Sequence, residues 1–209
     1  MTVLRLIFVR HGETQWNREY RIQGSSEVSL NSYGVLQSQQ VANALSGPVQ
    51  RIYISPQLRA REFAAPLAER HGIMPQIAEG LKEMCFGRWE GLRYADMDSD
   101  SQRHFTDWSI DPLKYSPPDG ESLQQLADRV DAALAEIISG LKDGSTCVAI
   151  SHGGVIRTAV ALLLGMQLPM VSRIKIDTAS ITVLEEMPGL WKLALLNDTC
   201  HLRLPTEDL

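Results

Sequence analysis

The chain has 209 residues, of which 44% are hydrophobic and 22% charged, and it carries a formal net charge of −5 with an isoelectric point near 5.5. These proportions are those of a folded globular protein and exclude an intrinsically disordered chain. A net acidic chain without a lysine- and arginine-rich run is not expected to bind nucleic acid, so any anion site must be local.

The length fits one domain spanning residues 1–209. The apolar stretch near the N-terminus is about seven residues long, too short for a signal peptide core or a membrane span, so we expect a cytoplasmic protein without a membrane partner. Cys85, Cys147 and Cys200 are far apart in the sequence. Their spacing supports neither a disulfide framework nor a cysteine zinc site.

The first part of the chain alternates strand and helix patterns. A buried strand ends at the polar run Arg10-His11-Gly12-Glu13-Thr14, and Gly72 is a glycine signal for the end of a helix. The expected elements are a strand over residues 2–9, a helix over 33–45, a strand over 51–55, a helix over 57–70 and a short strand over 74–78.

Residues 80–120 have no regular pattern, and we interpret them as an excursion over the edge of the sheet. Apolar residues at helical spacing then predict a helix from Leu123 to Leu141, with Ser122 and Gln125 at capping-box spacing. The remaining expected elements are a strand over 146–151, a helix over 155–164, closing strands near 180–184 and 190–196, and a loose tail after Leu204. This order predicts an α/β fold, a three-layer α/β/α sandwich with a mainly parallel central sheet and helices on both faces.

Two histidines follow predicted strands directly. His11 follows the first strand and His152 a later one, and each precedes a glycine that lets a ligand approach the backbone closely. The carboxyl ends of parallel strands lie at one edge of the sheet, where helix N-termini present free N–H groups to anions. We therefore expect one shared pocket, with the amide of Gly153 as a further donor.

Several motifs occur together in one order. They are Arg10-His11-Gly12-Glu13-Thr14, Trp16-Asn17, Arg21-Ile22-Gln23-Gly24, Ser55-Pro56-x-x-Arg59-Ala60, Glu83 with Gly87-x-Trp89-Glu90-Gly91, Gly120-Glu121-Ser122 and Ser151-His152-Gly153-Gly154-Val155-Ile156-Arg157. Over most of the chain they resemble the histidine phosphatase superfamily, which includes the phosphoglycerate mutases. The resemblance implies a phosphoglycerate mutase-like fold and phosphoryl transfer through a phosphohistidine, without a metal or other cofactor.

The resemblance implies that His11 is the nucleophile, and the residue types agree. Arg10 and Arg59 offer forked donors of permanent charge for a phosphate and keep a nearby imidazole neutral. The second nitrogen of His11 should donate to a backbone carbonyl, and His152, if protonated, would add a third cation.

The resemblance selects Glu83 as general acid and base over Glu79, Glu90 and Glu121. A carboxyl group beside a phosphate dianion should have a raised pKa, which suits it to protonate a leaving oxygen. The resemblance also implies that Asn17, Gln23 and Gly24 touch the phosphate or form the rim of the pocket.

Several of these residues could have other roles, structural ones among them. His11 alone could be a capping or core histidine, and Arg61 is a rival to Arg59, although residues two apart on a helix face different ways. His11, Glu83 and His152 could hold a zinc ion, but two nearby arginines would repel it. Trp16 and Trp89 fit either the pocket entrance or the core, and for His71, His104 and His201 we favour structural roles, although His201 resembles a segment near the pocket.

We favour a phosphatase over two alternatives, a cofactor-dependent phosphoglycerate mutase and a non-catalytic module that binds phosphorylated metabolites. Gln23-Gly24 replaces the Gly-Trp type of segment that is typical of mutases. The expected partner is a small phosphomonoester, because phosphoserine, ribazole-phosphate and sugar-phosphate phosphatases all resemble the chain, and our lean is towards L-phosphoserine. A homodimer is a family-level expectation.

Overall fold

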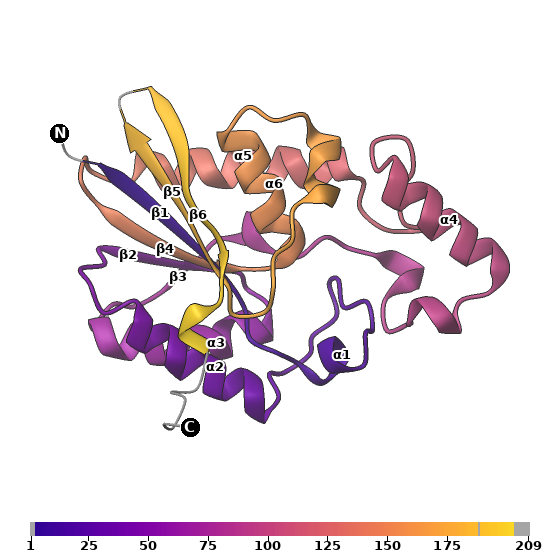
Figure 1. Ribbon diagram of the computed structural model, residues 1–209, viewed down its shortest axis with the longest axis horizontal. Helices are drawn as coiled ribbons and strands as arrows, with labels where there is room; N and C mark the ends of the chain where they lie inside the picture. Colours follow the sequence, from indigo (N-terminus) through magenta and orange to yellow (C-terminus); the bar gives the residue numbers. More distant parts are fainter. Residues whose placement is uncertain (1–2, 188, 203–209) are drawn as a thin grey trace, which may run out of the picture.

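The computed structural model describes residues 3–187 and 189–202 (Figure 1). Its strands form one sheet in the order β3-β2-β4-β1-β5-β6. The pairs from β3 to β1 are parallel, whereas β5 is antiparallel to both β1 and β6. The strands are β1 (Leu4–Arg10), β2 (Arg51–Ile54), β3 (Gln76–Ile77), β4 (Thr146–Ser151), β5 (Ile181–Met187) and β6 (Leu190–Asp198).

Apolar side chains point to both faces of the central strands. On β1, Leu6 and Phe8 belong to one buried cluster and Ile7 and Val9 to another, because successive side chains in a strand point to opposite faces. Figure 1 shows the helices α5 and α6 on one side of the strands and α2 and α3 on the other. Their bounds are α2 (Ser32–Ala44), α3 (Leu58–His71), α5 (Leu123–Ser139) and α6 (Gly153–Leu163).

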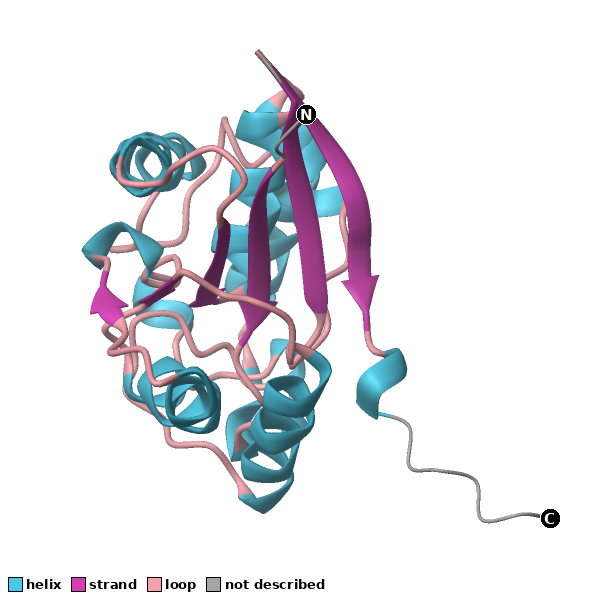
Figure 2. Ribbon diagram, turned by 90° about the vertical axis from the view of Figure 1, so that its left-hand side faces the viewer, coloured by secondary structure: helices cyan, strands magenta, loops and turns pink. Residues whose placement is uncertain are grey.

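The resulting architecture is the three-layer α/β/α sandwich that the sequence predicts. Figure 2 shows the strands side by side with helices packed against the sheet. In the N-terminal loop, the short helix α1 (Gln15–Arg18) follows β1. None of the helices in residues 3–187 and 189–202 is long and apolar enough to cross a membrane.

The local end signals act as expected. Ser122 accepts a hydrogen bond from the backbone of Gln125, and the side chain of Gln125 accepts one from the backbone of Ser122, so the capping box at the start of α5 is complete. Gly72 ends α3 in the left-handed conformation, with φ of 62°. Leu141 lies beyond the end of α5, and the tail after Leu204 lies outside the described residues.

The prediction of irregular structure for residues 80–120 is wrong over α4 (Ser99–Ile110). Asp98 caps this helix by accepting from the backbone of Ser101. Its packing depends on a few aromatic side chains, since Phe105 and Trp108 contact the buried Trp89 at ring-centroid distances of 5.2 and 5.8 Å. Figure 1 shows that α4 lies away from the sheet. A helix that does not pack along a sheet needs no continuous apolar stripe, so the sequence pattern did not reveal it.

Candidate active site

The register of the sheet brings the two predicted histidines together. β1 and β4 are parallel neighbours with Arg10 opposite Ser151, and both histidines follow directly. The backbone N–H of His11 donates to the carbonyl oxygen of Ser151 at 2.9 Å. The imidazole centroids of His11 and His152 lie 5.1 Å apart, so the two strand ends form one site.

The hydrogen bonds of His11 define the orientation of its ring. Nδ1 lies 2.7 Å from the carbonyl oxygen of Gly12, an acceptor, so Nδ1 carries the proton. Nε2 is then unprotonated and accepts from Nε of Arg59 at 3.3 Å. Burial lowers the pKa of His11 well below its usual value, and the charges of Arg59 and Arg10 lower it further. The imidazole is therefore neutral with its lone pair on Nε2.

Arg59 is a buried cation held by backbone carbonyls. Its terminal nitrogens donate to Ser26 and Gly24 at 2.8 and 2.9 Å. Burial lowers its pKa to about 10, which still leaves it charged at neutral pH. Arg61 is exposed, so the structure places Arg59 in the site rather than its neighbour.

Arg10 supplies the second guanidinium and is partly buried. Nη1 donates to the carbonyl oxygen of Ile176 at 2.7 Å, whereas Nε is buried and has no hydrogen-bond partner in the described part of the chain. Gly153 lies beside it, because a Cβ added there would sit 3.7 Å from Nε of Arg10. The N-terminus of α6 therefore adjoins this arginine.

The surroundings of His152 favour its neutral form, whereas the sequence led us to expect a third cation if this residue is protonated. Burial lowers its pKa well below the usual value, and the charges of Arg59 and Arg10 act in the same direction. Nε2 lies 2.7 Å from Oγ of Ser55, which also accepts from the backbone N–H of Gln57 at 3.3 Å. We assign the hydroxyl of Ser55 as the donor to Nε2, which places the proton of His152 on Nδ1, a buried atom without a partner among the described residues.

Glu83 borders the pocket through hydrogen bonds that its carboxylate accepts. Oε1 accepts from the backbone of Met84 at 2.9 Å and Oε2 from the backbone of Gly154 at 3.2 Å. Gln57 links it to the arginine, since its Oε1 accepts from the Glu83 backbone at 2.8 Å and from Arg59 at 3.3 Å.

The three rival carboxylates have other partners. Glu90 accepts from Ser25 and Ser26, Glu121 pairs with Arg129 at 2.6 Å, and Glu79 pairs with Lys82 at 3.0 Å on the surface. Of the four candidate carboxylates for the general acid, Glu83 is the one that the structure places beside His11 and Arg59 in one pocket.

This pocket has a volume of about 320 Å³. The backbone N–H of Thr14 donates to Oδ1 of Asn17 at 3.1 Å and its hydroxyl donates to Oε1 of Gln23 at 3.0 Å, so the amide NH₂ groups of Asn17 and Gln23 remain as donors. The sequence-predicted residues that line it are Arg10, His11, Asn17, Gln23, Gly24, Arg59 and Glu83.

Trp89, Trp16 and His201 do not line this pocket and make packing or backbone contacts instead. Trp89 is buried in the aromatic cluster under α4, and Trp16 packs over Gly91. His201 lies 3.0 Å from the carbonyl oxygen of Ala179, whose N–H is shared between the carbonyl oxygens of Arg10 and His11. His201 thus supports the backbone behind the site without lining it.

Sequence reasoning missed two kinds of residue. Ser55 and Gln57 orient His152, Arg59 and Glu83, and the motif around Arg59 contains both of them without indicating a role. The pocket is also lined by Arg21, Phe86, Phe105, Trp108 and Arg157, for which no role was predicted. Within residues 3–187 and 189–202, no group of three or more His, Cys, Asp or Glu side chains is arranged to hold a metal ion.

The chain is similar to known proteins over nearly its whole length. Residues 6–199 match the model of the histidine phosphatase superfamily, branch 1. A relative from Hydrogenobacter thermophilus named "Putative phosphoserine phosphatase 2" is 32% identical over 95% of this chain and 98% of its own length. "Probable phosphoglycerate mutase GpmB" from Enterobacter sp. is 33% identical over 99% and 98%.

A solved structure agrees with these relatives. A mutant phosphoserine phosphatase from Entamoeba histolytica, in complex with phosphoserine, is 30% identical, with a TM-score of 0.83 over 96% of this chain and 100% of that chain. The chain therefore belongs to branch 1 of the histidine phosphatase superfamily, and it is an enzyme that hydrolyses phosphomonoesters.

Proposed function

We propose that the enzyme is a metal-independent phosphatase of a small phosphorylated metabolite, acting through a phosphohistidine on His11. The observation that carries the proposal is the state of His11: a neutral imidazole whose Nδ1 is bound to Gly12 and whose Nε2 lone pair lies beside Arg59. Such a nitrogen is a nucleophile, and the cations around it attract the phosphate that it attacks.

The proposed reaction has two steps. In the first, Nε2 of His11 forms a bond to phosphorus while the ester P–O bond breaks, and the carboxyl group of Glu83 gives its proton to the leaving oxygen. In the second, water attacks the phosphohistidine, Glu83 takes a proton from that water, and the P–N bond breaks. The products are an alcohol and inorganic phosphate, and His11 and the protonated Glu83 are restored.

The arginines and His152 would stabilise the charge on the transferring group. Arg10 and Arg59 supply fixed positive charge, and the N–H assigned to Nδ1 of His152, which has no partner among the described residues, supplies a neutral donor. Asn17 and Gln23 present amide donors at the rim, and the backbone of Gly153 lies at the start of α6 beside Arg10.

The lean towards L-phosphoserine is supported by relatives that are named phosphoserine phosphatases. A phosphoglycerate mutase is the second candidate, because a relative of equal similarity carries that name. A cytoplasmic location, a homodimer and the lack of a nucleic-acid partner stay predictions from the sequence.

The proposal is tested by turnover and by trapping of the intermediate. We expect hydrolysis of p-nitrophenyl phosphate and L-phosphoserine in the presence of EDTA, and an acid-labile phosphoryl group on the enzyme after rapid quenching. His11→Ala should abolish both, whereas the control His71→Ala, at the end of α3, should leave both unchanged. Loss of activity in EDTA would contradict metal independence, and interconversion of phosphoglycerates without net hydrolysis would favour the mutase.

A further inference from the structure

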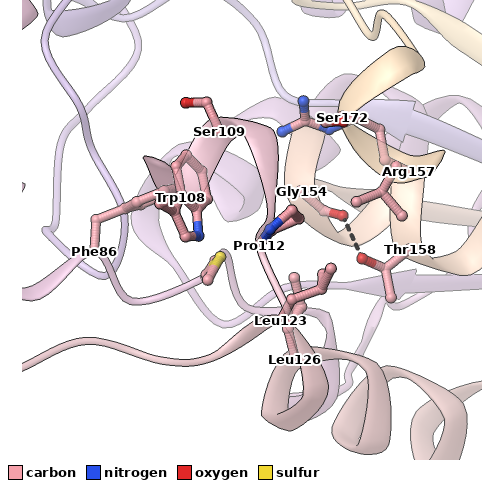
Figure 3. Close-up of a pocket in the computed structure, with 12 residues that line it drawn as sticks. Phe86, Trp108, Ser109, Pro112, Leu123, Leu126, Gly154, Arg157, Thr158 and Ser172 are labelled. Atoms are coloured by element: carbon pink, nitrogen blue, oxygen red, sulfur yellow. Dashed lines mark hydrogen bonds between the residues drawn. The ribbon is translucent and has the colours of Figure 1, made fainter. Parts of the chain in front are cut away.

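A second cavity adjoins the active-site pocket. It has a volume of about 210 Å³ and shares Phe86, Trp108 and Arg157 with the lining of the pocket that contains His11. Figure 3 shows it between the Phe86–Trp108 wall, the N-terminal part of α5 and the first turns of α6. The two spaces therefore meet at these three side chains.

The lining of this cavity is mainly apolar. Met84, Leu123, Leu126 and Val171 are buried side chains that form its walls, together with Pro112. An apolar cavity of about 150 Å³ is enough to hold a benzene molecule. This cavity can therefore take an aromatic ring or a branched carbon chain.

A polar group on its wall has no partner. The indole N–H of Trp108 is buried and makes no hydrogen bond within the described part of the chain. Buried donors are nearly always satisfied in folded proteins, so an unsatisfied one beside a cavity points to an acceptor that comes from a ligand.

Arg157 carries an unpaired charge at the junction. Its Nε donates to the carbonyl oxygen of Gly153 at 3.0 Å, and in residues 3–187 and 189–202 its terminal nitrogens have no hydrogen bond or ion pair. Arg21, the other newly found guanidinium of the pocket, is paired with Glu19 at 2.6 Å. In Figure 3 the Arg157 side chain extends from α6 towards the wall that carries Trp108 and Ser109.

We propose that Arg157 and this cavity form a subsite for the leaving group of the substrate, with Arg157 binding a carboxylate and the cavity taking an apolar ring or branched chain. The inference rests on the proposed function and narrows it. L-Phosphoserine supplies the carboxylate but would leave the cavity empty, so we depart here from the lean towards L-phosphoserine and assign a larger, less polar phosphomonoester as the preferred substrate.

Two aryl esters separate the carboxylate from the apolar part. The phosphate ester of 3-(4-hydroxyphenyl)propanoate and 4-propylphenyl phosphate have nearly the same shape and leaving oxygen, and they differ in the carboxylate. Their dissociation constants are measured by calorimetry on His11→Ala, which holds the ester without turnover. Binding then reports the subsite even if the catalytic proposal fails, and turnover by the unsubstituted enzyme reports the catalytic proposal separately.

Arg157→Met, made in the His11→Ala background, tests the charge. We expect it to weaken binding of the carboxylated ester about 10- to 100-fold, as for loss of a charge-assisted hydrogen bond, and to change binding of the propyl ester less than about 3-fold. Arg157→Lys should restore part of the difference. An equal loss for both esters would overturn the proposal, because Arg157 would then act on the phosphate or on the fold.

Ser109→Phe tests the cavity. Ser109 is an exposed residue of α4 on the lip of the cavity, so a phenyl ring there fills the space from outside without disturbing the core. We expect weaker binding of both aryl esters and unchanged binding of inorganic phosphate. Thr106→Phe, an exposed position of the same helix outside the cavity lining, is the matched control. Unchanged ester binding in Ser109→Phe would overturn the cavity assignment.

Discussion

At the scale of single residues, the site is a neutral imidazole surrounded by buried cations. The sequence correctly suggested that nearby arginines keep His11 uncharged, but burial contributes more to its lowered pKa than either arginine does. The burial of His11 depends on how distant segments of the chain pack around it, and no local motif indicates that packing. For the same reason the lowered pKa of His152 was not predictable, since its main cause is burial by distant residues that fold around it.

Glu83→Gln tests the proposed proton donor. The amide keeps the size of the side chain but cannot give a proton to a leaving oxygen. We expect kcat/KM for L-phosphoserine, with a poor alkoxide leaving group, to fall about 10²- to 10⁴-fold, and that for p-nitrophenyl phosphate to fall much less. Glu79→Gln, at an exposed carboxylate, is the control. An equal loss on both substrates would remove Glu83 from this role.

Ser55→Ala tests how His152 is held. The change removes the hydroxyl that lies 2.7 Å from Nε2 and leaves this buried nitrogen unsatisfied. Such a loss costs about 1–3 kcal/mol, equivalent to roughly a 5- to 150-fold decrease if it falls on the transition state. We expect kcat to fall within that range and the nitrogen NMR shifts of His152 to show a change of tautomer. The exposed Ser139→Ala should have neither effect, and an unaltered tautomer in Ser55→Ala would contradict the assignment.

At the scale of elements, the site depends on close contact of the loop after β1 with the helices α2 and α3. A Cβ at Gly12 would lie 2.6 Å from the carbonyl oxygen of Gly34 and 3.0 Å from the ring of Phe63. The carbonyl oxygen of Gly12 also accepts from Nδ1 of His11. The glycine therefore lets α2 and α3 approach the residue that orients the nucleophile.

Gly12→Ala should damage both stability and catalysis. The added methyl group must displace backbone, and overpacking of this kind costs about 1–3 kcal/mol. We expect a lower free energy of unfolding in urea and a lower kcat, because the carbonyl that orients His11 moves. Gly47→Ala is the matched control, since a Cβ there would meet nothing within 4 Å. Wild-type kcat in Gly12→Ala would show that the orientation of His11 does not depend on this contact.

The elements also show where sequence reasoning stops. The strand over 146–151 and the capped helix from Leu123 are signalled by their own apolar periodicity and end residues, and both are confirmed. α4 was missed because its stability comes from aromatic contacts with a distant turn, although Asp98 with Ser101 was a usable capping signal. The pocket wall that α4 provides, including Trp108, was missed with it.

At the scale of the whole molecule, the order of the strands determines the site. β1 and β4 are adjacent although they lie far apart in the sequence, and this adjacency joins His11 to His152. The sequence predicted the shared pocket because parallel strands present their carboxyl ends at one edge. It could not predict the leaving-group side of the pocket, whose residues come from α4, the turn at Phe86 and α6, without a common motif.

The buried histidines should also make the stability of the fold depend on pH. Burial, with the arginine charges, lowers the pKa of His11 and His152 well below 6.5 in the folded protein. Above about pH 6.5 both states hold these rings neutral, so the two residues contribute no pH dependence. Below it the unfolded chain binds protons that the folded chain does not, and the free energy of unfolding falls as pH falls.

The expected slope is up to about 1.4 kcal/mol per pH unit for each of the two residues. We expect urea unfolding, measured in phosphate-free buffer between about pH 6.5 and 5.5, to show this loss in the unsubstituted enzyme. His152→Asn should reduce the slope by up to that amount, whatever its effect on stability at neutral pH, whereas His71→Asn serves as the control for losing a histidine elsewhere. Equal slopes in His152→Asn and the unsubstituted enzyme would mean that His152 takes up a proton in the folded state, which would restore it as a cation beside the phosphate.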